Sequence, residues 1–144
     1  NCKDACYTCL KIYRNMNYHG LLDWRLGISL IRVLSDPDYS LGAEDGDFSS
    51  FYELKDFITY NHLLAQHFAE SFRLEKLDTY EDLPIIKTAN DLFILVVNPL
   101  WNCNIRDGSI DSPEDTWLTE RIVDIQQQFD CGEEQIRLID SFNL

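Results

Sequence analysis

The spacing of hydrophobic and polar residues in the first half of the chain predicts two amphipathic helices. Apolar residues recur at helical intervals from Leu21 to Leu34, and Asp36-Pro37 marks the end of this first helix. The pattern Ser50-x-x-Glu53 is typical of a capping box, so a longer second helix is expected from there to about Phe72. The predicted inward faces are Leu22, Leu26, Leu30 and Val33 in the first helix, and Phe51, Leu54, Phe57/Ile58, Leu64 and Phe68 in the second.

The second half of the chain predicts a small sheet followed by two more helices. Two strands, Pro84 to Thr88 and Leu92 to Val97, are separated by turn residues 89–91, which favours a hairpin or short meander. A helix is expected to start at Ser112-Pro113 and to stop at Gly132. A last helix is expected from Glu133 to Phe142. The predicted core positions are Leu118, Ile122, Ile125 and Phe129, and then Ile136, Ile139 and Phe142.

Length and composition indicate one folded domain with an uneven charge distribution. The chain has 144 residues, 45% of them hydrophobic and 12% aromatic, which argues against disorder. The net charge of −13 excludes a polyanion binder that works through its whole surface. Residues 1–34 hold five basic and two acidic side chains (+3), whereas residues 35–144 hold the other seven basic and 23 acidic ones (−16). We call these segments the head and the acidic body, and expect them to pack as one domain.

Three of the five cysteines lie within eight residues, as Cys2-x3-Cys6-x2-Cys9. An odd number of cysteines without a secretion signal is poor support for disulfides, whereas closely spaced thiols in an intracellular protein favour a metal. The spacing predicts a zinc knuckle, because two residues between sulfurs allow both thiolates to face one ion. The fourth ligand stays open between His19, Cys103 and a residue upstream of Asn1. The sequence thus predicts an α+β fold, mostly helical, with an N-terminal zinc knuckle.

Other interpretations of these residues are weaker. The cysteines could be small buried hydrophobic residues, or C-x3-C-x2-C could hold an iron–sulfur cluster as in radical SAM enzymes, although the alternating strands and helices of such a barrel are not apparent. His62 and His67 are five residues apart, which is not the spacing of a helical metal pair. Cys131 is expected to be structural. No catalytic set can be assigned, and a zinc ion with four protein ligands would be structural.

A longer pattern around the cysteines gives a resemblance to a known family. It consists of Cys6-x2-Cys9-Leu10, then Tyr13-x-Asn15, then His19-x-Leu21-Leu22-Asp23 followed by Arg25. This stretch resembles the zinc-binding domain of unknown function at the C-terminus of large bacterial superfamily 2 helicases, which include Mrf-like repair helicases and DISARM-type antiphage proteins. The match covers about residues 1–34, with weaker likeness to about residue 50.

The resemblance implies a non-catalytic accessory domain of a DNA helicase or translocase in bacterial defence or repair. Its zinc ligands would be Cys2, Cys6, Cys9 and His19, although related helicases have a cysteine near the position of His19. The domain would lie against the motor domains of the parent chain or a partner subunit. Lys11, Arg14 and Arg25 in the basic head would contact nucleic acid. The alternative is a protein-interaction module, without DNA binding, whose acidic body docks on basic motor domains.

The remaining features bear on location and on the parent protein. The chain begins at Asn1 without a hydrophobic leader, and no stretch of 18 apolar residues is present, so we expect a cytoplasmic protein without a membrane partner. The missing initial Met suggests a fragment of a longer protein. Walker and Asp-Glu-x-His motifs are not found in this sequence, so ATP binding by the expected parent helicase would lie outside it.

Overall fold

The structure is a computed structural model that describes residues 4–36, 38–39, 41–42, 46–101 and 116–144. It confirms the α+β class. Within these residues the order of elements is η1 (Tyr13–Leu21), α1 (Trp24–Ser35), α2 (Tyr52–Phe72), β1 (Glu75–Leu77), β2 (Ile85–Lys87), β3 (Phe93–Val97), α3 (Thr116–Phe129), η2 (Glu133–Gln135) and β4 (Ile136–Asp140). None of the helices described is long and apolar enough to cross a membrane.

The sheet is a three-strand meander to which a parallel strand is added. Its order is β1-β2-β3-β4; β1, β2 and β3 pair antiparallel, whereas β3 and β4 are parallel. The β2–β3 hairpin follows the prediction, with Ile86 opposite Ile94. Its turn is closed by a hydrogen bond from the Thr88 N–H to the Leu92 carbonyl (2.9 Å), and Asp91 adopts the left-handed conformation there (φ 55°).

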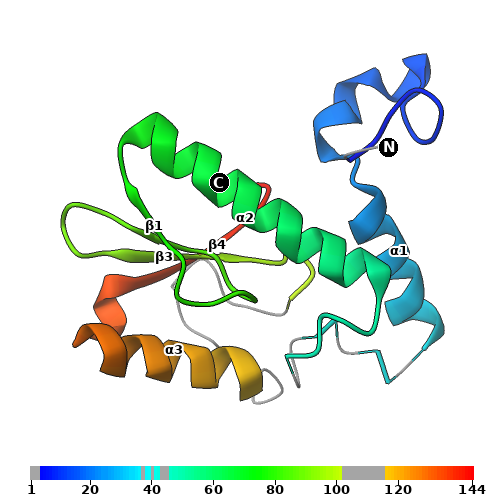
Figure 1. Cartoon of the computed structure of the whole chain (residues 1–144). Helices are drawn as coiled ribbons and strands as arrows, with labels where there is room; N and C mark the ends of the chain where they lie inside the picture. Colours follow the sequence, from blue (N-terminus) through cyan, green and yellow to red (C-terminus); the bar gives the residue numbers. More distant parts are fainter. Residues whose placement is uncertain (1–3, 37, 40, 43–45, 102–115) are drawn as a thin grey trace.

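The sheet is covered on both faces, which explains why β3 is apolar along its whole length. Figure 1 shows α2 along one side of the sheet and α3 along the other. Ala65 and Ala69 of α2 pack with Ile86 and Val96, and their small side chains allow the helix to lie close to the sheet. The opposite face contributes to the main core, which includes Ile85, Phe93, Leu95, Val97, Leu118, Ile125, Ile136 and Leu138. Burial on both faces favours a continuous apolar strand over an alternating one.

An aromatic cluster extends this core at the start of α3. The ring centroids of Phe48, Trp101 and Trp117 lie 5.0–5.8 Å apart. Gly46 has a positive φ of 70°, and a Cβ there would approach Trp117 to 2.4 Å. Glycine is therefore required at this position for both conformational and steric reasons.

Two predicted helix boundaries differ from the structure. The second helix begins at Tyr52, after Phe51 as N-cap, and the Ser50 hydroxyl donates to Asp47 instead of capping the helix, so the predicted capping box is wrong. The stop at Gly132 is also displaced. Helix α3 ends at Phe129, and Asp130 takes the left-handed conformation (φ 49°), while Gly132 precedes η2. The predicted start at Ser112-Pro113 lies outside the described residues.

The predicted last helix is a strand. After the short η2, residues 136–140 form β4, in which Ile136, Leu138 and Asp140 are buried and Arg137 is exposed. The spacing of Ile136 and Ile139 fits a helix, but the alternation of Ile136 with Leu138 fits a strand equally well. The strand forms because residues 136–140 pair in parallel with the edge of β3, and this pairing satisfies the backbone N–H and C=O groups of that edge.

The first helix, α1, is shorter than predicted, and it is rotated about its own axis, so that a different face packs on the body. It starts at Trp24, capped by the Asp23 carboxylate, which accepts a hydrogen bond from the Arg25 N–H (2.8 Å). Arg25 and Ser29 are buried together with Leu26, while Leu30 is 48% exposed. The prediction that Leu30 and Val33 face the core is therefore wrong. Charged and hydroxyl groups form much of the contact with α2, and aliphatic residues face outward.

Candidate metal centre

Cys6 and Cys9 are brought together by a tight turn at the start of the head. The carbonyl of Cys6 accepts hydrogen bonds from three successive N–H groups, those of Cys9 (3.1 Å), Leu10 (3.1 Å) and Lys11 (2.9 Å). The N–H of Cys6 in turn donates to the sulfur of Cys9 (3.1 Å). These bonds fold the chain back on itself between the two cysteines. We call residues 6–11 the knuckle turn.

The separation of the two sulfurs agrees with a shared metal ion. Cys6 Sγ and Cys9 Sγ lie 3.5 Å apart, well beyond disulfide length. Two thiolates bound tetrahedrally to zinc at about 2.3 Å from the ion lie about 3.8 Å apart. A change of a few tenths of an ångström would thus make them a ligand pair. The hydrogen bond from the Cys6 N–H also fixes the position of the Cys9 sulfur relative to the turn.

The other predicted ligands are not placed by the structure. Cys2 and Cys103 lie outside the described residues, and His19 lies in η1 but its side chain is not described. Among the residues that are described, no three His, Cys, Asp or Glu side chains form a group that could hold a metal ion. Of the predicted ligands, the structure therefore places the side chains of Cys6 and Cys9 alone. Cys131, which was expected to be structural, packs against the main core, and burial raises the pKa of its thiol.

Asn15, part of the motif noted in the sequence, fixes the exit of the knuckle turn. Its side-chain amide donates to the Leu10 carbonyl (2.8 Å), and its side-chain oxygen accepts from the Ile12 N–H (2.8 Å). Asn15 itself departs from helical geometry (φ −109°, ψ 19°). An amide side chain can satisfy a donor and an acceptor at once, so it joins the knuckle turn to the first turn of η1.

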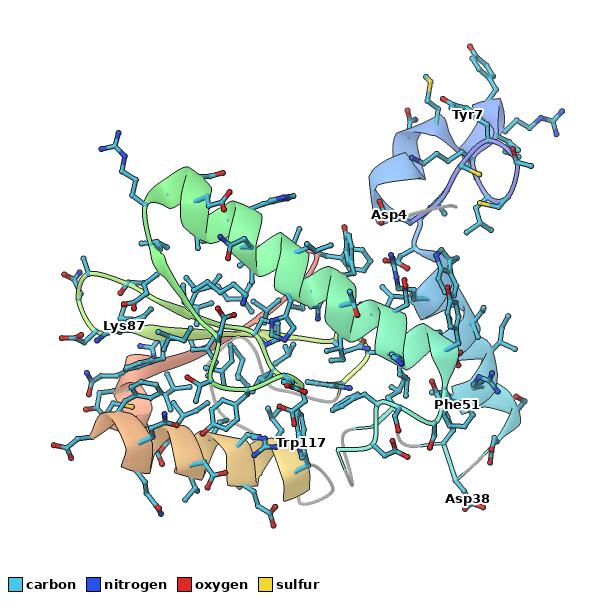
Figure 2. All side chains as sticks on the ribbon, in the orientation of Figure 1. Asp4, Tyr7, Asp38, Phe51, Lys87 and Trp117 are labelled. Carbon is cyan, nitrogen blue, oxygen red and sulfur yellow. The ribbon has the colours of Figure 1, made fainter. Side chains whose placement is uncertain are left out.

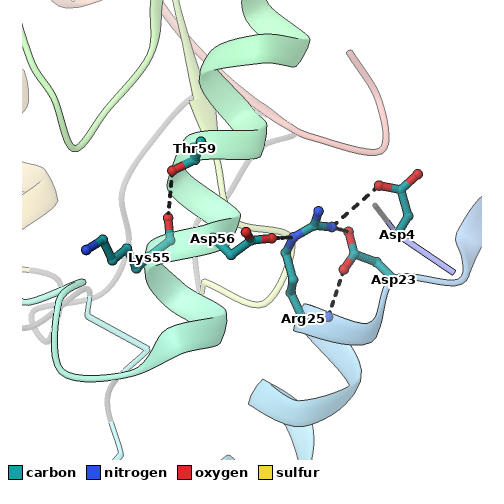
Figure 3. A network of polar contacts seen from close by, with 6 residues as sticks. All are labelled: Asp4, Asp23, Arg25, Lys55, Asp56 and Thr59. Carbon is teal, nitrogen blue, oxygen red and sulfur yellow. Dashed lines mark hydrogen bonds and ion pairs between the residues drawn. The ribbon is translucent and has the colours of Figure 1, made fainter. Parts of the chain in front are cut away.

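Arg25, at the start of α1, connects Asp4 near the knuckle turn to Asp56 on α2, as Figure 3 shows. Its side chain is 4% exposed and forms ion pairs with Asp56 (2.6 Å), Asp23 (2.8 Å) and Asp4 (3.5 Å). The guanidinium also lies over the ring of Tyr60, 4.5 Å from its centroid. The backbone adds a further link, because the Trp24 N–H donates to the Asp4 carbonyl (3.1 Å). The carboxylate partners of Arg25 were missed by the sequence analysis, although Asp23 stands at an N-cap position.

Burial and charge act in opposite directions on this network. Burial raises the pKa of Asp23 above its ordinary value, and the hydrogen bonds and charge of Arg25 offset only part of that effect. Burial would lower the pKa of Arg25, but the carboxylates of Asp56 and Asp23 raise it overall. Asp23 is therefore ionised in an unfavourable environment, and its ionisation depends on the guanidinium.

The three basic residues predicted to contact nucleic acid do not form one surface. Arg14 is exposed on η1. Lys11 is half-buried and lines a cavity of about 280 Å³ together with Asp4, Asp23 and Tyr60. The guanidinium of Arg25 is enclosed by three carboxylates, so its role in the structure is to hold elements together. The prediction of nucleic-acid contacts then depends on Arg14 and Lys11.

A second recess lies on the body, between α2 and β1. It is an open groove of about 630 Å³, and its lining includes His62, Leu63, Lys76 and Tyr80. His62 Nε2 is 3.0 Å from the carbonyl of Glu81, and burial together with the charge of Lys76 lowers the pKa of His62. His67, five residues further along α2, is exposed.

Comparison with family models, with curated proteins and with solved structures gave no significant match to this chain.

Proposed function

We propose that this chain is a non-catalytic accessory domain stabilised by structural zinc. The observation that carries the proposal is the knuckle turn, which holds Cys6 Sγ and Cys9 Sγ 3.5 Å apart, with a backbone donor on one sulfur. Cys2 and His19 would complete the ligand set. A zinc ion with four protein ligands has no open position for water or substrate, so its contribution is folding energy.

The zinc would fix the head on the body through the contacts of Asp4. This residue lies two positions before Cys6, its carbonyl accepts from the N–H of Trp24, and its carboxylate pairs with Arg25. Arg25 reaches Asp56 on α2. Metal binding at the knuckle turn would therefore also stabilise the neighbouring Asp4, and through its contacts with Trp24 and Arg25 would hold the knuckle turn in a defined orientation on α1.

The cellular role that we propose is in a bacterial DNA helicase or translocase of defence or repair. The support is the resemblance of residues 1–34, in which the cysteine pair, Asn15, His19 and Leu22-Asp23 recur at the spacing of that family. The domain would lie on motor domains in the parent chain or a partner subunit, and these would supply ATP hydrolysis. Arg14 and Lys11 would add contacts to the DNA backbone.

A protein-interaction module without DNA binding is the second candidate, and exposed apolar side chains favour it. On the head, Tyr7 is 75% and Tyr13 85% exposed, and Leu10, Ile12 and Met16 are each at least 40% exposed. Figure 2 shows Tyr7 at the far end of the head, directed away from the body. Apolar groups at this density on a surface are typical of a protein contact.

Metal analysis and chelation test the zinc proposal. We expect about one zinc per chain, with loss of ordered structure in the head on chelation. Cys6→Ser and Cys9→Ser should each lower metal content and the temperature of unfolding. Cys131→Ser is the matched control and should retain the metal, because Cys131 packs on the main core. Metal-free protein that keeps the spectrum and unfolding temperature of the native chain would refute the proposal.

Binding assays with single-stranded DNA separate the two candidates. If Arg14 and Lys11 contact phosphates, Arg14→Ala and Lys11→Ala will weaken binding, and affinity will fall steeply with salt. Lys55→Ala is the control, since Lys55 is an exposed lysine on α2, in the acidic body. Binding that is absent, or equally affected by all three variants, would favour the interaction module.

A further inference from the structure

The outward face of α1 is apolar, although the face that it packs on the body is largely polar. Gly27, Leu30, Ile31 and Leu34 recur at helical spacing and form one stripe, which we call the α1 stripe. Leu30 is 48%, Ile31 66% and Leu34 79% exposed. Ile28 and Val33 flank the stripe and are 38% and 41% exposed.

The opposite face of α1 shows that this orientation is fixed by specific contacts. Arg25 is held by Asp23 and Asp56, and Arg32 pairs with the buried Glu53 of α2 and lies over the ring of Phe51. The polar face of α1 is thus the one that α2 requires. The helix cannot turn its aliphatic residues inward without breaking these ion pairs.

We propose that the α1 stripe binds the α1 stripe of a second copy of this chain, with the two helices antiparallel. The stripe is self-complementary about its centre, between Leu30 and Ile31. A two-fold axis at that point places Leu34 of each copy over Gly27 of the other, because both lie equally far from it in sequence. Leu34 is the most exposed member of the stripe, and a Cβ added to Gly27 would meet nothing within 4 Å. In the symmetric pair, Leu34 of each copy therefore faces the open space at Gly27 of the other copy.

The charge distribution leaves the α1 stripe as a surface where two copies can meet without charge repulsion. The chain carries a net charge of −13, so two copies repel each other across most surfaces. On α1 the charged residues are Arg25 and Arg32, both engaged with carboxylates of the same chain, so the stripe itself is neutral.

The exposed area fits a weak, reversible dimer. Ile28, Leu30, Ile31, Val33 and Leu34 together expose on the order of 500 Å² per copy, which is in the range of the largest apolar patch on a typical monomer. Pairing would bury at most about 1,000 Å² in total, which is below the range of stable specific interfaces and within that of weak, transient ones. The dimer does not depend on zinc or on the proposed function, because both partners in the contact belong to α1.

Sedimentation over a range of concentrations up to sub-millimolar tests the dimer. We expect the native chain to change from monomer to dimer, and Leu34→Gln to raise the dissociation constant by about tenfold or more. Leu63→Gln is the matched control, since Leu63 is 56% exposed on α2, away from the stripe, and it should leave dimerisation unchanged. A second variant, Gly27→Leu, fills the open space and should weaken the dimer without lowering the unfolding temperature.

Cysteine cross-linking tests the orientation. A mixture of Gly27→Cys and Leu34→Cys chains should form the mixed disulfide between positions 27 and 34, identified by peptide mass spectrometry. Disulfides only between identical positions indicate a parallel pair and would overturn the antiparallel arrangement.

A native chain that stays monomeric at every concentration, or a dimer that is indifferent to Leu34→Gln, overturns the proposal. So does a monomer whose stripe binds phosphatidylserine vesicles, because the occupant would then be a membrane surface.

Discussion

Replacement of Arg25 by methionine is the sharpest test of how the head is held. Methionine keeps most of the side-chain length but removes the guanidinium, which pairs with Asp23, Asp56 and Asp4 at 2.8, 2.6 and 3.5 Å. The Asp23 side chain is 7% exposed, so it would remain buried without a counter-charge. The helix N-cap would persist, because the Asp23 carboxylate accepts from the backbone N–H of residue 25, which methionine retains.

The magnitude follows from the burial of each partner. Removing one member of a buried ion pair typically costs about 3–5 kcal/mol, because the other charge is left without compensation. Asp56 and Asp4 are 35% and 42% exposed, so water replaces much of what they lose, and exposed pairs contribute at most about 1 kcal/mol. Asp23 therefore dominates, and we expect Arg25→Met to reduce the free energy of unfolding by about 3 kcal/mol at neutral pH.

Urea denaturation at pH 7 and pH 4 measures this effect and its electrostatic origin. Burial raises the pKa of Asp23 in the native chain, and removing Arg25 raises it further. A carboxyl group with a raised folded pKa binds protons more tightly when folded, so the variant regains stability as the pH falls toward 4. Arg14→Met is the matched control, and we expect a change within about 0.5 kcal/mol because Arg14 is exposed.

Two results would refute this reasoning. A stability loss of the same size at both pH values would mean that lost packing, and not an uncompensated Asp23, is responsible. Unchanged stability with weakened DNA binding would mean that Arg25 contacts nucleic acid, as the sequence pattern predicts, and that the ion network is dispensable.

Three further predictions follow from local features. Gly27→Ala should raise the free energy of unfolding by about 0.5–1 kcal/mol, because the new methyl group meets nothing within 4 Å and alanine loses less backbone freedom than glycine in a helix. Denaturant unfolding of dilute protein measures this change. Hydrogen bonds from Ser50 and Ser49 lower the pKa of Asp47 to about 2, and this pKa should rise in Ser50→Ala, as measured by NMR titration of the carboxyl group. The stability that the ionised Asp47 contributes is present above about pH 4 and is lost as the pH falls toward 2. Burial and the charge of Lys76 lower the pKa of His62, so the stability contributed by the neutral imidazole should be lost as the pH falls below about 6.5. Lys76→Gln should raise the pKa of His62 in an NMR titration of the imidazole, and an unchanged pKa would contradict repulsion by Lys76.

Much of the fold could be predicted because local patterns were unambiguous. Helix α2 and the β2–β3 hairpin have clear periodicity and turn residues, and both are found near the expected bounds. Strand β4 could not be predicted, since Ile136-Arg137-Leu138-Ile139 satisfies both periods and only the edge of β3 selects the strand. The three-residue β1 has too few side chains to give a pattern.

The candidate site was accessible from the sequence only where the residues are close neighbours. Cys6 and Cys9 are three positions apart, and a single turn brings their sulfurs together. The environment of Arg25 was not accessible, because Asp56 is 31 residues away and meets it only through the packing of α1 on α2. The rotation of α1 likewise depends on a contact between residues far apart in sequence. Helical periodicity alone predicts that Leu30 faces inward, but the ion pair of Arg32 with Glu53 turns Leu30 outward.

The position of β4 has a consequence for the order of folding during synthesis. The meander β1–β2–β3 consists of neighbours in sequence and can form as soon as residue 97 has left the ribosome. Its last strand, Phe-Ile-Leu-Val-Val, then presents an unpaired, uncharged edge until residues 136–140 arrive and pair with it in parallel. Such an edge is a template for pairing with other nascent chains. The interval between the synthesis of the two strands is therefore the period in which this edge is most open to pairing between chains.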